Sequence, residues 1–341
     1  MTEHASKLGT DPCWLPHRVD VRKGEVSFLR LDREAHRRAT FLTDEYIGVD
    51  TPRRTLPIAA LDVAARSAIP GRCHFIFHSA FCCSTLLARA FDIPGSAMGL
   101  KEPTALMDLS EAALSGVQIG RILGPVLDLL SRPLSPSEAV VIKPTNVVNP
   151  LIDALLAQRG DAHALLLYSP LPAFLRSVAQ KGLFGRIWAR RSAASLARRP
   201  EFDPGYSAAE RWEHSDLQVA ALAWLQQQAQ FARLARSQPA GRVATLDSET
   251  LLADPLRALT ALAALFQLDV PGLALDEIAT GPIFTRNSKR HDQPLDASLR
   301  AEQHAQAANA YGEEITMVVR WAEAVANHVG IPMQLSAPLI R

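Results

Sequence analysis

The chain has 341 residues, 48% of them hydrophobic, which is enough to bury a sizeable core in one large domain or two smaller ones. Its formal net charge of +1 gives no argument for nucleic acid or an anionic membrane as a partner, and no apolar run is long enough to span a membrane. The polar N-terminal segment has no apolar signal core. The four cysteines fit neither a disulfide framework nor the ligand spacing of a zinc site, so we expect a reduced cytoplasmic protein without metal: Cys13, Cys73, Cys82 and Cys83.

Residues 1–70 predict an N-terminal extension to a larger domain of residues 71–341. Within it, residues 14–31 indicate two short strands joined at Arg22-Lys23-Gly24, because alternating apolar residues flank a turn sequence. Residues 32–55 are mixed and charged and favour no particular element, whereas residues 61–69 have a helical pattern. We expect the extension to cover an edge of the main sheet; a role in substrate specificity is the alternative.

Residues 72–89 are the most informative stretch of the chain. A short apolar run at 73–77 predicts a buried strand, residues 78–83 a turn, and Ser84 the start of a helix. A strand-to-helix turn leaves several backbone N–H groups unpaired at the positive end of the helix dipole, which favours an anion. The turn has no lysine and no glycine pair, so it is not a Walker A motif. The hydroxyls of Ser84 and Thr85 also fit a simple N-cap, and the adjacent cysteines fit small buried residues better than a redox pair.

Strands then alternate with helical patterns. Apolar strands are predicted at 98–102, 139–143 and 163–167, with helical segments at 104–130 (broken at Gly116), 149–158 and 171–181. This order favours an α/β fold with a parallel sheet flanked by helices, in which ligands bind at the carboxyl ends of the strands. Four chemically versatile residues fall at such ends: His78, Glu102, Lys143 and Tyr168. Each also has a structural alternative, as a strand-end charge or a buried histidine.

The last 160 residues are largely helical. Residues 185–200 are basic and predict a solvated helix face, with an acidic-substrate patch as the alternative. Residues 202–206 form a Pro/Gly loop, and residues 207–236 predict one long helix whose stripe of Trp212, Leu222 and Leu225 belongs to the core. A strand at 242–246, a helix at 256–266, a basic loop at 285–295 and two closing helices follow.

The turn at Cys83-Ser84-Thr85-Leu86-Leu87 resembles the loop with which sulfotransferases hold the 5′ end of 3′-phosphoadenosine 5′-phosphosulfate (PAPS). Later segments resemble further landmarks of that family, in the same order. Ile142-Lys143-Pro144-Thr145 stands in the place of a strand ending in Lys-Thr-His. Leu167-Tyr168-Ser169-Pro170, followed by Arg176 and Ser177, matches the frame that binds the 3′-phosphate. The segment from Asp247 to Pro255 and the basic loop around Lys289 and Arg290 complete the series.

The sequence departs from the family pattern at four positions. Phe81 replaces the basic residue of the first loop, Cys83 its glycine, Tyr168 the arginine of the 3′-phosphate site, and Thr145 the histidine base. Each change removes a charge, a donor or a flexible position. The resemblance therefore predicts a divergent member with a P-loop-like fold, and the departures put its donor in question.

The resemblance implies a PAPS-dependent sulfotransferase whose acceptor is a hydroxyl or amine of a small molecule or a peptide. It implies no metal cofactor and no nucleic-acid or membrane partner. The donor would be held by the loop around Cys82 and Cys83, by Ser84 and Thr85, and by Arg176, Ser177, Lys289 and Arg290. Lys143 would neutralise the bridging oxygen, and Glu102 or His78 would act as the base. The alternatives are a non-catalytic member that binds a nucleotide or a protein partner, and an ATP-dependent kinase.

Overall fold

The computed structural model describes residues 2–198, 201–285 and 297–340. The chain forms two compact units. The first comprises Met1–Phe77, Thr85–Ala164 and Ala263–Pro271, and the second His78–Ser84, Leu165–Leu262 and Gly272–Arg341. Residues 2–70 belong to the first unit together with the early strands of the main sheet; the boundary predicted after residue 70 stays a prediction.

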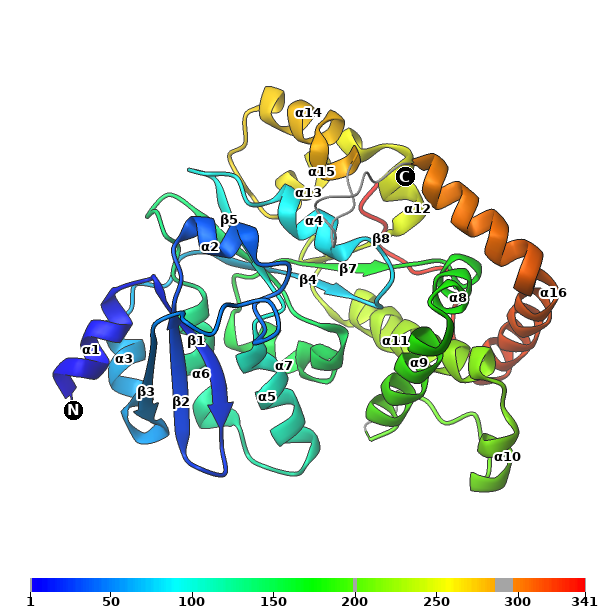
Figure 1. The fold of residues 1–341 in the computed structure, drawn as a ribbon, viewed down its shortest axis with the longest axis horizontal. Coiled ribbons are helices and arrows are strands. Elements are labelled where there is room, and N and C mark those ends of the chain that lie inside the picture. Colours follow the sequence, from blue (N-terminus) through cyan, green and yellow to red (C-terminus); the bar gives the residue numbers. More distant parts are fainter. Residues whose placement is uncertain (1, 199–200, 286–296, 341) are drawn as a thin grey trace. The chain divides into compact units, whose positions relative to one another are not determined.

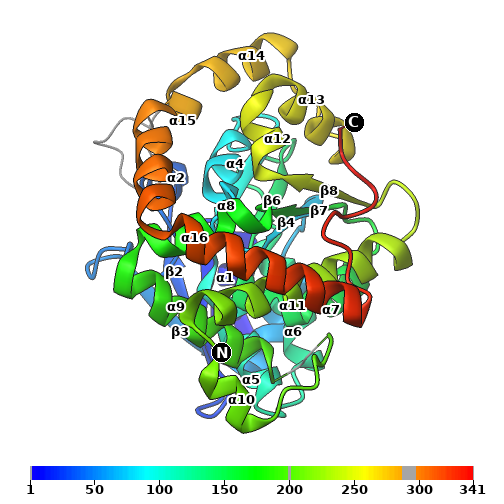
Figure 2. The same cartoon turned by 90° about the vertical axis from the view of Figure 1, so that its right-hand side faces the viewer.

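The predicted α/β class is confirmed. Five strands form one parallel sheet in the order β5-β6-β4-β7-β8. Figure 1 labels β4, β5, β7 and β8, and Figure 2 labels β6. Their bounds are β4 Cys73–His78, β5 Ala97–Lys101, β6 Ala139–Lys143, β7 Ala164–Tyr168 and β8 Val243–Asp247. The strands that follow β4 in the chain, β5 and β6, lie on one side of it, and the later strands β7 and β8 lie on the other side. The strand order therefore reverses at β4. In open parallel sheets such a reversal marks the usual ligand site.

The parallel strands of the first unit are buried on both faces. Every residue of β4, β5 and β6 is buried, as expected for strands that read as continuous apolar runs. Strand β6 pairs with β4 at Phe75 and Ile142, and with β5 at Lys101 and Lys143. This register brings the last residues of β5 and β6 level with each other.

A three-stranded antiparallel sheet precedes these strands. It consists of β1 (Trp14–Asp20), β2 (Glu25–Arg30) and β3 (Arg53–Pro57), in that order. The predicted hairpin is confirmed: Val19 lies opposite Val26, and Gly24 adopts φ +70° in the turn. Strand β3 and the polar first helix are not predicted by the sequence. The helices of this unit are α1 Thr2–Thr10, α2 Arg33–Arg38, α3 Leu61–Ser67, α5 Thr104–Leu114, α6 Gly120–Leu130 and α7 Ile152–Gln158, with 3-10 turns at Ile58–Ala60 and Asn146–Leu151.

The second unit is mainly helical. Helix α16 packs against α8 and α11, and α9 packs against the same two helices (Figure 2). The bounds are α8 Leu171–Gln180, α9 Gly182–Leu196, α10 Ala208–Glu213, α11 Asp216–Ser237, α12 Ser248–Ala253, α14 Gly272–Thr280, α15 Pro282–Thr285 and α16 Ala297–Val329. Two helices pass from one unit to the other along the chain: α4 Ser84–Ala90 and α13 Pro255–Leu265.

The prediction of one helix over residues 207–236 is wrong. The helix is interrupted at His214, because Ser207 and Ser215 each begin a separate capping box. Helix α10 buries none of its residues. Trp212, predicted to be part of the core, is 83% exposed, whereas Leu225 is fully buried as predicted.

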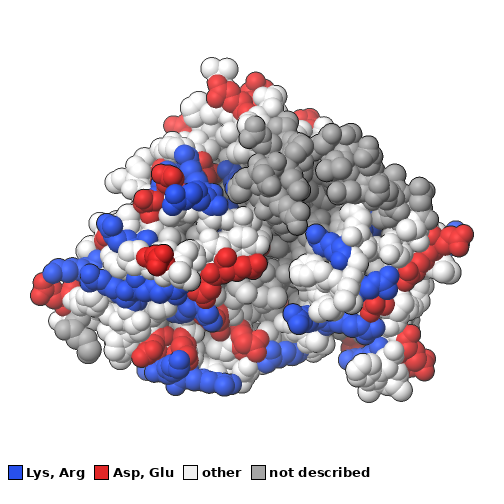
Figure 3. Space-filling view, viewed as in Figure 1, with Lys and Arg blue, Asp and Glu red and all other residues white. Residues whose placement is uncertain are grey.

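Positive and negative side chains are interspersed on the face drawn in Figure 3, in keeping with the net charge of +1. Within the described part of the chain, none of the helices has both the length and the hydropathy that crossing a membrane requires.

Gly99 allows α4 to lie directly on β5. A Cβ atom at this position would lie 2.5 Å from the carbonyl oxygen of Ala88 in α4. We therefore expect Gly99→Ala to lower the free energy of unfolding by about 2–3 kcal/mol, because a backbone oxygen cannot move aside. The midpoint of urea unfolding measures this. Gly120→Ala is the matched control, because nothing lies within 4 Å of its Cβ position; an unchanged midpoint in the Gly99 variant would contradict the packing argument.

Candidate functional site

Backbone strain is concentrated after two strands of the parallel sheet, β4 and β5, which lie on either side of β6. Six non-glycine residues of the described chain have left-handed backbone angles, and four of them directly follow β4 or β5: Ala80 (φ 68°), Phe81 (51°), Cys83 (62°) and Glu102 (55°). Each costs about 1–2 kcal/mol for a residue with a Cβ atom. Strain of this kind persists where surrounding contacts hold it, and it clusters at ligand sites.

The turn after β4 is held by contacts within the second unit. The Ser79 N–H donates to the Leu167 carbonyl oxygen at 3.0 Å, and the Gln227 side chain donates to the Ser79 carbonyl oxygen at 3.3 Å. Gln227 is fully buried on α11. A buried side-chain amide must make its hydrogen bonds within the protein, so Gln227 holds the Ser79 carbonyl oxygen, and with it the turn, in place.

His78 supports the same turn. Its Nδ1 accepts a hydrogen bond from the Ala80 N–H at 3.0 Å, and the side chain is buried. An accepting Nδ1 carries no proton, so the neutral ring carries its hydrogen on Nε2. This arrangement favours a structural role for His78, and its predicted role as a base stays a prediction with weaker support than that of Glu102.

The turn ends at the start of α4 with a change in the sign of φ. Cys83 is left-handed and lies between Cys82 and the first helical residue, Ser84, neither of which has a positive φ. Where a right-handed and a left-handed residue alternate, successive N–H groups turn toward one point, the geometry of an anion-binding nest. Cys82 and Ser84 are buried and Cys83 is half-buried, while Thr85, also buried, continues α4 in the first unit.

Phe81, which stands where the sulfotransferase pattern has a basic residue, lies beside a cation from another segment. The Lys181 Nζ is 5.7 Å from the centroid of the Phe81 ring, and the ring also packs edge-on against Trp188 at 4.6 Å. Lys181 follows the last residue of α8. No sequence pattern marks this lysine, because only the tertiary packing brings it to the turn.

Arg176 and Ser177 lie side by side on α8, and both are half-buried. The Nε of Arg176 is shielded from solvent and has no hydrogen-bond partner among the described residues. An unpaired buried donor costs about 1–3 kcal/mol, which an anionic ligand would recover. Tyr168, in the place of the family's arginine, ends β7 and is buried; burial raises the pKa of its hydroxyl, so it stays neutral.

The second chemical group lies in the first unit, where β5 and β6 end. Lys143 is fully buried, and its ammonium group forms an ion pair with the Glu102 carboxylate, which remains 17% exposed. The left-handed backbone of Glu102 lets its N–H donate to the Lys143 carbonyl oxygen at 2.7 Å. The structure therefore brings together two of the three residues that the sequence proposed for catalysis, Glu102 and Lys143, whereas His78 belongs to the second unit.

Two aromatic residues from the N-terminal segment complete this cluster. The Lys143 Nζ lies 5.2 Å from the centroid of the Phe41 ring, a cation–π contact, and Phe41 packs edge-on against Tyr46 at 5.2 Å. Burial, with the charges of Glu45 and Glu102, raises the pKa of the Tyr46 hydroxyl. The sequence analysis did not find these two residues, because residues 32–55 have no periodic pattern.

Two further buried residues, Lys101 and His36, contact each other in the N-terminal part of the same unit. The Lys101 Nζ donates to the His36 carbonyl oxygen at 2.7 Å, at the end of α2. Burial, with the charge of Arg89, lowers the pKa of Lys101 to about 8. Burial also lowers the pKa of His36 to about 3, helped by the charges of Lys101 and Arg33.

The predicted site residues thus form two groups, each within one unit. Glu102 and Lys143 are paired in the first, where Thr85 also lies. The second contains His78, Cys82, Cys83 and Ser84 on the turn, with Arg176 and Ser177 on α8. Lys289 and Arg290 lie outside the described residues.

Comparison with protein-family models and with curated protein sequences gives no match. Two solved structures are similar to this one. The sulfotransferase domain from the curacin biosynthetic pathway has a TM-score of 0.44 at 12% identity, over 72% of this chain and 98% of that domain. The sulfotransferase domain from the olefin synthase of Synechococcus PCC 7002 has a TM-score of 0.40 at 14% identity, over 71% of this chain and 95% of that domain.

The neutral, buried His36 makes stability depend on pH. Its pKa is about 3 in the folded chain and about 6.5 when unfolded, so between these values only the unfolded chain takes up the proton. The contribution is therefore complete above pH 6.5 and is lost as pH falls toward 3. We expect the wild type to lose about 2 kcal/mol more than His36→Leu between pH 7 and pH 5, measured by urea unfolding. The exposed His328→Gln serves as the control; equal losses in wild type and His36→Leu would refute the assignment.

Proposed function

We propose that this protein is a PAPS-dependent sulfotransferase that transfers a sulfuryl group to a hydroxyl or amine acceptor. The observation that carries the proposal is the concentration of left-handed, non-glycine residues after β4 and β5. Core packing alone gives no reason to keep four such residues at the strand ends where an open parallel sheet binds its ligands. The sequence landmarks from residue 72 to residue 295 supply the identity of the ligand.

The turn after β4 would hold the 5′-phosphosulfate. Its backbone N–H groups, with Ser84 and Thr85, offer donors to the anion, and the ammonium group of Lys181 adds positive charge near Phe81. A rigid set of donors costs little reorganisation when charge develops on the transferred group. The anchoring by Gln227 and the Leu167 carbonyl supports that rigidity.

The 3′-phosphate would bind Arg176 and Ser177, with Lys289 and Arg290 as further partners expected from the sequence. The Arg176 Nε that lacks a hydrogen-bond partner among the described residues supports this assignment. Arginine forms paired hydrogen bonds with phosphate oxygens, so one residue can replace part of the charge lost at Tyr168.

Lys143 and Glu102 would act on the transferred group and on the acceptor. PAPS supplies a sulfuryl group whose bond to the bridging phosphate oxygen breaks while a bond from sulfur to the acceptor oxygen or nitrogen forms. Lys143 would leave its partner and neutralise the charge that builds on the bridging oxygen. Glu102, released from the ion pair, would take the acceptor's proton. Adenosine 3′,5′-bisphosphate and the sulfated acceptor leave, so atoms and charge balance.

A non-catalytic member that binds a nucleotide is the second candidate function. The specific observation in its favour is that Phe81 and Tyr168 leave two cofactor positions without charge, Tyr168 being buried and neutral. This alternative shares the binding step of the proposal and lacks the transfer step, so turnover distinguishes the two.

Adenosine 3′,5′-bisphosphate should stabilise the protein more than ATP does, in excess EDTA. At one hundred times its dissociation constant the ligand should add about 2.7 kcal/mol, a rise of a few degrees in melting temperature. Arg176→Gln should reduce the rise, whereas Arg191→Gln, which changes an exposed arginine of α9, should not. A melting temperature that does not move at millimolar ligand would sink the proposal, and a strict need for Mg²⁺ would favour a kinase.

Glu102→Gln should slow sulfuryl transfer by roughly 10² to 10⁴ fold, because it removes the base. Lys143→Met should slow it by roughly 10² to 10³ fold, because it removes the charge that stabilises the bridging oxygen. Release of adenosine 3′,5′-bisphosphate from PAPS, measured with a panel of phenols, alcohols and amines, reports the rate. The exposed Glu25→Gln is the control. Wild-type turnover in the Glu102 variant would remove its role as base.

The same two variants should differ in stability. Glu102→Gln leaves the Lys143 ammonium buried without its counter-charge, whereas Lys143→Met leaves a carboxylate that already reaches water. We expect a loss of about 3 kcal/mol for the first and less than half of that for the second. Rates are therefore compared well below both melting temperatures.

A further inference from the structure

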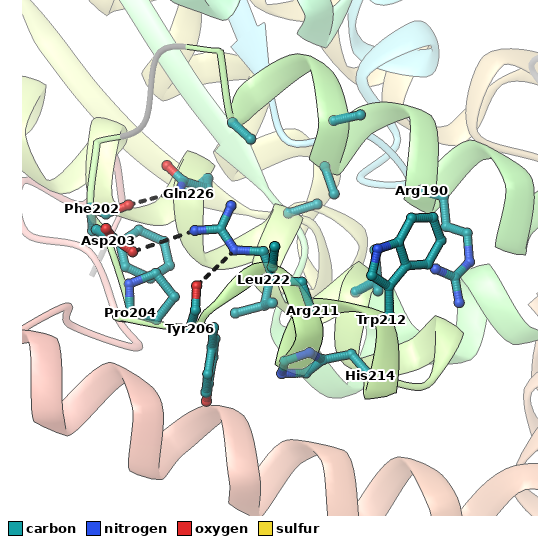
Figure 4. A pocket seen from close by; sticks show the side chains of 16 residues that line it. Arg190, Phe202, Asp203, Pro204, Tyr206, Arg211, Trp212, His214, Leu222 and Gln226 are labelled. Carbon is teal, nitrogen blue, oxygen red and sulfur yellow. Dashed lines mark hydrogen bonds and ion pairs between the residues drawn. The ribbon is translucent and has the colours of Figure 1, made fainter.

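The second unit contains a pocket whose lining residues are not among those proposed for sulfuryl transfer. It has a volume of about 510 Å³ and lies among α9, the loop at 202–206, α10 and α11 (Figure 4). This volume lies in the range that holds a small molecule, about 300–1,000 Å³. Beside Arg190, small side chains line this side of the pocket: Ala193 and Ala194 on α9, and Ala197 directly after it, so a flat molecule can lie close to the helix backbone.

Aromatic side chains form much of the remaining wall. Phe202 and Tyr206 line the pocket from the loop, and Trp212 lines it from α10. Trp212 is 83% exposed, which leaves a large apolar ring in water. Rings of this kind stack on flat aromatic ligands, and a bound ring system would cover part of the exposed indole.

The charged groups at the pocket are compensated. Arg190 donates to the Asp216 carboxylate at 2.6 Å, and Arg211 lies 3.7 Å from the Asp203 carboxylate and donates to the Tyr206 carbonyl oxygen at 3.1 Å. Figure 4 shows the contacts of Arg211 within the lining. Because each arginine already has a carboxylate partner, an anionic ligand would gain little and would also face those carboxylates. An uncharged ligand therefore suits this lining better than an anion does.

His214 adds an uncharged polar group to the wall. It is 9% exposed, and its Nδ1 has no hydrogen-bond partner among the described residues. The ring is positioned by Tyr206, at 4.6 Å between ring centroids, and by Trp321, at 5.3 Å. Buried ring nitrogens normally have a partner, and the Nδ1 is shielded from solvent, so a hydroxyl or amide group on the ligand would satisfy it once the ring turns toward the pocket.

We propose that this pocket binds a small, uncharged molecule that has an aromatic ring system and one hydrogen-bonding group. The inference does not depend on the proposed sulfuryl transfer, because it concerns binding alone. Three observations support it: the aromatic wall, the ion-paired arginines, and the His214 Nδ1, which has no hydrogen-bond partner among the described residues.

Isothermal titration calorimetry of the full chain with two matched probes tests the proposal. Naphthalene-2-carboxamide is uncharged, and naphthalene-2-carboxylate has the same shape with a negative charge. We expect the amide to bind with a dissociation constant on the order of 100 μM, and the carboxylate at least fivefold more weakly. Absence of heat for the amide at about 1 mM, or tighter binding of the carboxylate, would overturn the proposal.

Three variants place the binding in this pocket. Ala194→Phe fills the space beside α9 and should weaken amide binding at least tenfold. Trp212→Ala should weaken it by about three- to tenfold through the lost ring contact, and His214→Phe by about fivefold through the lost hydrogen bond. Leu183→Ala is the control, since Leu183 is 73% exposed on the same helix and does not line the pocket. Circular dichroism confirms folding of each variant; equal affinity in the Ala194, Trp212 and control variants would refute the site.

Discussion

A fully buried ammonium group on Lys143 is the constraint on which the first chemical group depends. Removing a charge from water costs several kcal/mol, so the lysine must have a partner at the end of its strand. Glu102 supplies it, and reaches that position because its backbone is left-handed and its N–H bonds to the Lys143 carbonyl oxygen. Phe41 covers the ammonium group from the N-terminal segment. The left-handed backbone of Glu102, the buried charge of Lys143 and the packing of Phe41 therefore depend on one another. A change in any of the three leaves the Lys143 ammonium group less well compensated and lowers the stability of the fold.

In the turn after β4, an unfavourable backbone conformation likewise depends on contacts from other elements. Ala80, Phe81 and Cys83 lack the freedom of glycine, so their left-handed angles last only where other contacts fix them. The Leu167 carbonyl oxygen, the amide of Gln227 and the ring of His78 provide those contacts. A glycine-rich turn can adapt to its ligand, whereas this one is fixed before any ligand arrives. Fixed donors suit an anion whose charge moves during a reaction, because they need not reorient as it does.

The sequence predicted most of the parallel sheet because buried parallel strands read as short apolar runs; the strand at 139–143 has the predicted bounds. It missed α1, whose residues are polar, and joined α10 to α11 although Ser207 with Glu210 and Ser215 with Gln218 give two capping signals. For the site, the strand-end positions of Glu102 and Lys143 could be predicted from topology. Their pairing could not, since it requires a glutamate in a backbone conformation that residues with a Cβ atom rarely adopt. Phe41, Tyr46 and Lys181 reach their partners only through tertiary packing.

The departures from the sulfotransferase pattern look different once the positions of the charges are known. Phe81 removes a cation from the turn, yet the Lys181 ammonium group lies 5.7 Å from the Phe81 ring. Tyr168 removes another, while Arg176 on the same helix as Ser177 has an Nε without a hydrogen-bond partner among the described residues. Arg176 lies on α8 and Lys181 directly follows that helix, so under the proposed function one part of the second unit would supply both cations. An anion responds to where charge lies in space and not to which residue carries it. A sequence motif registers Phe81 and Tyr168 only as missing cations. In the second unit, Lys181 and Arg176 place positive charge near the turn and on α8, which a sequence motif does not register.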